Sequence, residues 1–173
     1  MNSVQIHLAL THVPVILSFV GLIMLIVAFF IKKNTALIKI SYIVLLAAGV
    51  AATPVFLTGE GTEEAIENLP GVSEAVIERH EEVAKLAMIA IAAAGLVALA
   101  ALFSFKWQKA ARVFKVVVVL LAVTSGGLMA QTAHLGGQIR HTEIRAGVAL
   151  FSGSETNAEN ENSGSQQQEK DDD

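Results

Sequence analysis

Four long apolar runs dominate this 173-residue chain. Each approaches the ~20 residues that an α-helix needs to cross ~30 Å of hydrocarbon. One such run could be a buried core helix, but a soluble protein of this size cannot enclose four of them. Only 16% of the residues are charged, against about a quarter in a typical soluble domain. The sequence therefore predicts an all-α fold, an integral membrane four-helix bundle.

The predicted bundle occupies residues 1–151, and a polar tail follows it. We expect the helices at about 8–31, 40–57, 74–105 and 113–145, and we expect the polar segment between the second and third to be solvated. From Ser152 onward the chain is almost wholly Ser, Gly, Asn, Gln, Glu and Asp. Such a composition cannot bury enough apolar surface to offset the entropy of ordering. We therefore expect residues 152–173 to be disordered.

Charge distribution predicts the orientation in the membrane. The connections after the first and third helices are basic and carry no acidic residue, whereas all 16 acidic residues lie elsewhere. Short basic loops stay in the cytoplasm, so we expect both termini to be extracytoplasmic. The predicted location is the bacterial inner (plasma) membrane, as a multi-pass protein. The basic residues concerned are Lys32, Lys33, Lys39, Lys106, Lys109, Arg112 and Lys115.

All five histidines are predicted at the outer ends of the helices: His7, His12, His80, His134 and His141. Counting residues up from the basic end of each helix, at ~1.5 Å per residue, gives their depth. His12 and His134 then lie ~30 Å up, near the outer hydrocarbon boundary, and the other three lie ~8–10 Å further out. We therefore expect a deeper pair and a shallower trio.

Helical phase predicts which way these side chains point. His7 shares a face with Pro14, whereas His12 lies about 140° around the same helix. His80 lies on an otherwise apolar stripe and is expected to point into the packing. On the fourth helix, polar residues recur at steps of three and four and form a stripe that we expect to face inward: Gln131, His134, Gln138, His141 and Arg145.

This pattern predicts a bound metal or haem. Imidazole ligates haem iron, zinc and copper, and four-helix bundles hold cofactors between ligands on facing helices. One or two b-type haems are expected, with the deeper pair the better candidate for ligation. Small residues on three helices could line a haem slot, although they also serve ordinary membrane-helix packing. The cofactor-binding candidates are the five histidines, which are also the metal-ligand candidates, and the propionate-binding cations Arg140 and Arg145.

Several motifs carry a family resemblance. His7-x-x-x-x-His12-x-Pro14 opens an apolar helix, and Thr58-Gly59-Glu60, Arg79-His80-Glu81 and Leu135-Gly136-Gly137-Gln138-Ile139 follow, with His141 and Glu143. Over roughly residues 5–150 this ordered set resembles a bacterial family of predicted four-helix membrane proteins, a domain of unknown function. The resemblance implies the fold and the histidines. Some relatives are joined to c-type cytochrome segments, which implies redox work by association.

Three functions remain open. The first is a haem b-binding electron-transfer subunit, a redox carrier more than a stand-alone enzyme, with a periplasmic c-type cytochrome or a larger respiratory complex as partner. The second is a zinc or copper protein with a site at His7, His80 and His141, which leaves one open coordination position. The third is a structural or assembly subunit whose histidines only form hydrogen bonds. The chain has no cysteine and no phosphate-binding glycine loop, and we expect the lipid bilayer, not nucleic acid, as its environment.

Overall fold

The computed structural model describes residues 2–31, 34–141 and 144. Within these residues, four stretches are long and apolar enough to cross a membrane: Ser3–Phe30, Thr35–Ile66, Glu74–Ser104 and Gln108–Ile139. The predicted all-α bundle is confirmed, and its four apolar helices indicate a multi-pass membrane protein. The helices are α1 (Ser3–Leu10), α2 (His12–Phe30), α3 (Thr35–Leu57), α4 (Gly59–Ile66), α5 (Glu74–Ser104) and α6 (Gln108–Arg140).

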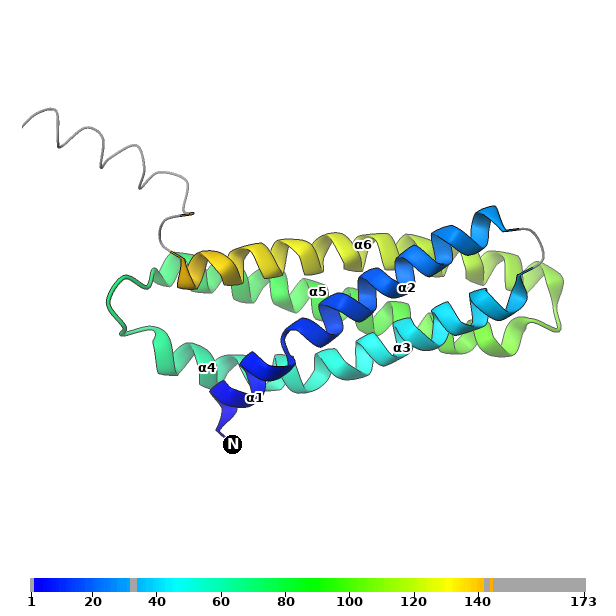
Figure 1. The fold of residues 1–173 in the computed structure, drawn as a ribbon. Helices are drawn as coiled ribbons and strands as arrows, with labels where there is room; N and C mark the ends of the chain where they lie inside the picture. Colours follow the sequence, from blue (N-terminus) through cyan, green and yellow to red (C-terminus); the bar gives the residue numbers. More distant parts are fainter. Residues whose placement is uncertain (1, 32–33, 142–143, 145–173) are drawn as a thin grey trace, which may run out of the picture.

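The four long helices form an elongated bundle (Figure 1). Both α2 and α5 pack against α3 and against α6, so α2 lies diagonally opposite α5. The short helices α1 and α4 pack against each other and against the adjoining part of α3. Figure 1 shows α1, α4 and the N-terminus at the end of the bundle where α5 begins and α6 ends. All five histidines belong to elements at this end, which we call the histidine end.

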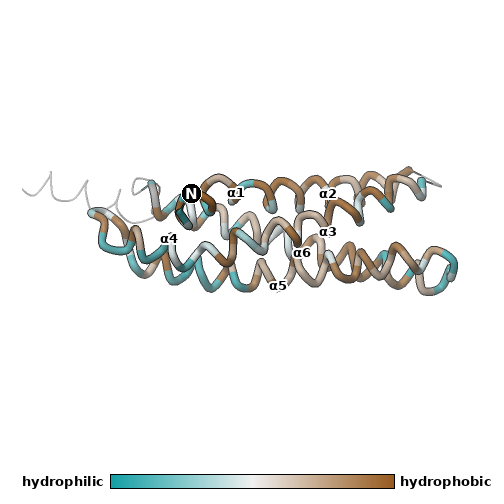
Figure 2. Tube along the Cα trace, turned by 90° about the horizontal axis from the view of Figure 1, so that it is seen from below, coloured by the Kyte–Doolittle hydropathy of each residue, from teal (hydrophilic) through white to brown (hydrophobic). Residues whose placement is uncertain are grey.

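The surface of the bundle has the polarity of a membrane protein. Large aliphatic side chains such as Ile23, Val50, Ile89 and Leu120 are exposed in the middle of their helices. Figure 2 shows this apolar middle flanked by hydrophilic residues at both ends. An apolar surface of this extent would cause a soluble protein to associate. In a membrane the same surface faces hydrocarbon, and the helices are stable there because each satisfies its own backbone hydrogen bonds.

Close packing between α3 and α5 depends on two glycines. A Cβ atom added to Gly49 would lie 3.2 Å from the carbonyl oxygen of Ile91, and one added to Gly95 would lie 3.3 Å from Cα of Leu46. Small residues let helix backbones approach closely in a membrane, where packing replaces the hydrophobic effect as the driving force. Both glycines belong to the small residues that could have lined a haem slot. In the structure they serve helix packing.

The opposite end of the bundle is basic. The ammonium group of Lys39 lies 5.0 Å from the ring centroid of Phe105, and that of Lys115 lies 5.2 Å from the ring centroid of Phe29. Both distances fall within the range of cation–π attraction. Each lysine stem thus covers an aromatic ring at the edge of the apolar surface while its charge stays at the membrane boundary.

The first helix differs from the continuous helix predicted at 8–31. It begins at Ser3, where the Asn2 and Gln5 side chains form a reciprocal capping box. It is interrupted at Thr11, between α1 and α2. Pro14 lacks the N–H that would bond to the carbonyl of Leu10, so the helix is weakest at this turn. The break gives α1 its own direction and lets it pack against α4.

Other boundaries also differ from those predicted. Helix α3 begins at Thr35 instead of 40, because the Asn34 side chain caps it by accepting a hydrogen bond from the Leu37 N–H at 3.0 Å. Helix α6 runs from Gln108 to Arg140 instead of 113–145. The segment predicted to be solvated contains α4, because Thr58 keeps helical backbone angles and the chain continues in a new helix. The predicted disordered tail, 152–173, lies outside the described residues.

A larger side chain at Gly95 should separate α3 from α5. We expect Gly95→Val to lower the free energy of unfolding by about 1–3 kcal/mol, the usual effect of overpacking a tight contact. Thermal unfolding in detergent micelles would measure this. Gly127→Val is the matched control, because nothing lies within 4 Å of a Cβ added there. Equal stability of the two variants would contradict the close contact.

Candidate functional site

His7 is anchored to the end of a neighbouring helix. It lies on α1 and is half-buried, and its Nδ1 lies 2.9 Å from the carbonyl oxygen of Val55, in the last turn of α3. A carbonyl oxygen can only accept, so Nδ1 carries the proton and donates it. In a neutral imidazole with this tautomer, Nε2 is an unprotonated acceptor. His7 therefore directs a free lone pair away from its anchor.

His80 repeats this arrangement on the other side of the bundle. It lies on α5, is half-buried as predicted, and places Nδ1 3.0 Å from the carbonyl oxygen of Thr132 on α6. The same reasoning gives a donating Nδ1–H and an unprotonated Nε2. The ring lies against the α6 backbone beside Gly136, where an added Cβ would come within 3.3 Å of the His80 Cε1 atom.

The two anchors share a local sequence pattern. In each, a glycine follows the accepting residue by four positions, Gly59 after Val55 and Gly136 after Thr132. In an α-helix the side chain at position i+4 lies beside the carbonyl of residue i. Its absence leaves that carbonyl open to an imidazole from another helix. A Cβ added to Gly59 would lie 3.8 Å from Cε1 of His7, so the His7 ring also occupies the space beside its glycine.

His7 and His80 are anchored in the same way at the same end of the bundle. His7 lies on α1 and His80 on α5, and the two rings interact electrostatically. Within the described residues, neither Nε2 atom has a hydrogen-bond partner. Histidines that bind metals commonly donate their second ring N–H to a backbone carbonyl, which fixes the tautomer and the ring orientation. Each of the two rings is therefore anchored in the way that is common for metal-binding histidines.

The deeper pair of the sequence prediction is not brought into the bundle. His12 is exposed, as its phase relative to His7 requires. His134 is also exposed and accepts a hydrogen bond from the Gln138 amide, with 3.1 Å between the two Nε2 atoms. The prediction that the polar stripe of the fourth helix faces inward is wrong. The inward face of α6 is taken by the buried Val118, Ala122, Ser125 and Met129.

The predicted three-histidine metal site is not formed. His141 follows the last residue of α6 and its side chain is exposed. In the part of the chain that the structure describes, no three His, Asp or Glu side chains are grouped so that they could hold a metal ion. Within the described residues, His7, His80 and His141 therefore do not form one ligand cluster. The Arg140 side chain and all of Arg145 lie outside the described residues, so their role at haem propionates stays a prediction.

Helix α4 completes the histidine end. It packs against α1, where a Cβ added to Gly61 would come within 2.8 Å of the Ser3 hydroxyl oxygen. An ion pair between Lys85 and Glu81, at 2.8 Å, lies on the neighbouring turns of α5. Sequence reasoning missed both the helix and the carbonyl anchors, since backbone acceptors leave no residue-type pattern. The signal it could have used was the pair of glycines that follow Val55 and Thr132.

No family model, no curated protein and no solved structure matches this chain. The family resemblance of the motifs therefore stays a prediction. The function has to be argued from the geometry of the histidine end.

Replacing Gly136 with alanine should displace His80 from its anchor. We expect Gly136→Ala to weaken the bond to Thr132 and to lower stability by about 1 kcal/mol, the usual net worth of such a hydrogen bond. The ring-nitrogen shifts of His80, measured by NMR in detergent, should change from a fixed Nδ1–H tautomer toward an averaged one. Gly127→Ala should leave them unchanged. Unaltered His80 shifts in Gly136→Ala would refute the anchor.

Proposed function

We propose that this chain is a membrane-bound, haem b-binding electron-transfer subunit in which His7 and His80 would hold one haem. The observation that carries the proposal is the shared anchoring of the two rings. Each imidazole donates Nδ1–H to a helix carbonyl and leaves Nε2, the usual ligand atom, unprotonated and without a partner among the described residues.

The residues present fit such a group in their donor chemistry. Four-helix bundles hold cofactors between side chains that come from different helices, and His7 and His80 come from α1 and α5. Haem, when bound, would itself be the group that accepts and donates one electron at a time. The protein supplies the orientation of both rings through the Val55 and Thr132 carbonyls, and these hydrogen bonds make each imidazole a stronger donor to iron.

The proposal assigns a single haem in place of the one or two expected, and it replaces the deeper pair with His7 and His80. His12 and His134 are excluded as ligands of this haem because both are exposed on the outside of the bundle. Two imidazoles are also too few for the three-ligand zinc or copper site, and within the described residues no third ligand joins them.

We further propose that the histidine end faces out of the cytoplasm, in a bacterial inner membrane. Supporting this, the basic residues with their cation–π contacts lie at the other end of the bundle, where the positive-inside rule puts the cytoplasm. Both termini are then extracytoplasmic. A haem near this face would exchange electrons with a periplasmic partner, either a c-type cytochrome or a larger respiratory complex.

A structural role is the second candidate, and the same hydrogen bonds favour it. The bond from His7 ties α1 to α3, and the bond from His80 ties α5 to α6. In this role the imidazoles would be needed for the assembly of the bundle, and the Nε2 atoms would not bind a cofactor.

An absorption spectrum of the purified, reduced protein separates the two candidates. After expression with added haem, we expect the Soret and visible bands of a six-coordinate low-spin b-type haem. His7→Ala and His80→Ala should each convert the haem to a five-coordinate high-spin form or release it, because one axial ligand is lost. The double variant should bind no haem.

His12→Ala and His134→Ala are the matched controls, because they remove exposed histidines from the same end of the bundle. Both should keep the wild-type spectrum. Absence of a Soret band in the wild-type protein would exclude the haem proposal. If His7→Ala and His80→Ala then lowered thermal stability while the two controls did not, the structural role would stand.

A further inference from the structure

A groove runs between α5 and α6 at the histidine end, on the outer surface of the bundle. Two adjoining depressions make it up, and both are lined by Ala75, Arg79 and Gln131. One extends to Glu78, Glu82 and Val83, and the other to His134, Leu135 and Gln138. We call it the α5/α6 groove. It contains neither His7 nor His80, so it is separate from the proposed haem site.

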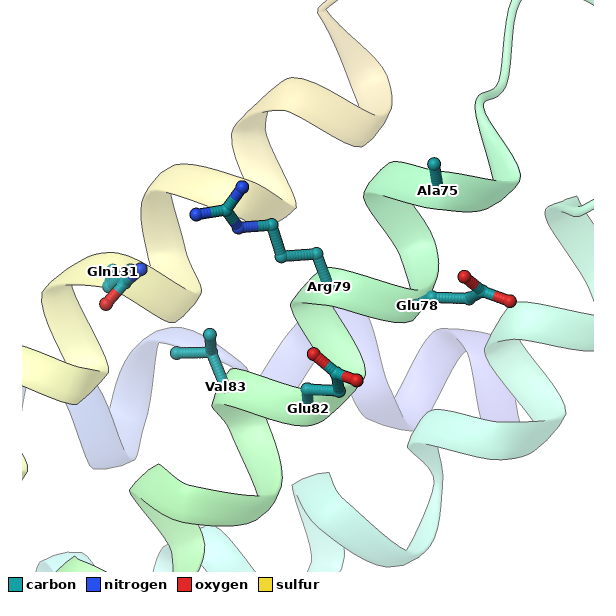
Figure 3. A pocket seen from close by; sticks show the side chains of 6 residues that line it. All are labelled: Ala75, Glu78, Arg79, Glu82, Val83 and Gln131. Atoms are coloured by element: carbon teal, nitrogen blue, oxygen red, sulfur yellow. The ribbon is translucent and has the colours of Figure 1, made fainter.

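Charge in the groove is arranged around one arginine. Arg79 is exposed and forms no ion pair with any described residue. Figure 3 shows its side chain reaching from α5 toward α6 and Gln131, with Glu82 on the next turn of α5 and Glu78 pointing away from α6. The groove thus offers a guanidinium and an amide on its α6 side and two carboxylates on its α5 side.

The groove lies at the edge of the apolar surface. Val83 closes it on α5, and one turn further along that helix Leu86 is 55% exposed. On α6, one turn before Gln131, Gly127 is exposed and has nothing within 4 Å of an added Cβ. Toward the middle of the bundle, the surface beside the groove is therefore apolar at Leu86 and open above Gly127. A ligand with a polar head and an apolar chain matches this sequence of surfaces.

We propose that the α5/α6 groove binds the headgroup of a zwitterionic phospholipid that carries a primary ammonium group. The phosphate lies at Arg79, whose planar guanidinium donates paired hydrogen bonds to phosphate oxygens, with the Gln131 amide as a further donor. The ammonium lies at Glu82 and Glu78 and donates to their carboxylates. An acyl chain lies along the apolar surface beside Leu86 and extends into the membrane.

The charges of the α5/α6 groove discriminate between phospholipid headgroups. A glycerol headgroup leaves the lipid with a net negative charge and gives the two carboxylates no cation. A choline headgroup has the positive charge but no N–H to donate to a carboxylate. An ethanolamine headgroup satisfies both sides of the groove, and binding of this kind would also hold α5 and α6 together at the histidine end.

The test uses the full chain, purified in detergent and stripped of lipid, with phospholipids of identical acyl chains added back. Lipid retention is measured by native mass spectrometry, and the shift of the thermal midpoint is measured in parallel. We expect the ethanolamine lipid to be retained best and to stabilise most. Arg79→Ala should weaken its retention by about tenfold or more, as loss of a charge-assisted hydrogen bond predicts. Arg112→Ala, which removes an exposed arginine from the basic end of α6, should not.

The carboxylates provide a second, independent arm. Glu78→Gln with Glu82→Gln should abolish the preference for the ethanolamine lipid over the glycerol lipid, whereas Glu64→Gln on α4 should preserve it. Three results would overturn the proposal: equal retention of all three lipids, full retention by Arg79→Ala, or displacement of the lipid by millimolar inorganic phosphate alone. Each readout is independent of haem, so the failure of either proposal leaves the other intact.

Discussion

Hydrocarbon cannot hydrogen-bond to a peptide group, and this constraint shapes the whole molecule. Every backbone donor and acceptor at membrane depth has to be satisfied within a helix, so the long apolar segments are helical. Where Pro14 removes one donor, the chain breaks into α1 and α2 at the polar edge of the bundle. Once α1 has its own direction, it carries His7 to the last turn of α3, where the Val55 carbonyl accepts a hydrogen bond from its ring.

The sequence predicted correctly those features whose free energy depends mainly on apolar side chains. Long apolar runs predicted four helices long enough to cross a membrane, and the apolar stripe that contains His80 predicted that its side chain points into the packing. Sequence reasoning failed on α6, where a polar stripe was expected to face the axis. Buried Val118 and Ala122 occupy that face instead, because packing of apolar and small residues decides which side of a membrane helix turns inward.

The partners of the histidines could not be predicted, for a physical reason. A backbone carbonyl is present at every position, so residue identity does not reveal which one accepts from His7 or His80. Depth counting also placed His141 on a continuous helix, whereas α6 ends at Arg140. Among the candidate histidines, the fold anchors His7 and His80 to neighbouring helices, and His134 lines the α5/α6 groove.

Gly59 and Gly136 show how a helix can present its own backbone as a binding surface. Gly136 lies inside α6, where glycine costs about 1 kcal/mol relative to alanine, so the chain gives up intrinsic helix stability at this point of the histidine end. In exchange, a carbonyl already engaged in the helix becomes accessible to a second donor from another segment. The spacing of four residues between acceptor and glycine is therefore a transferable device. It would let a designer of membrane proteins fix an imidazole against a helix without introducing a buried polar side chain on that helix.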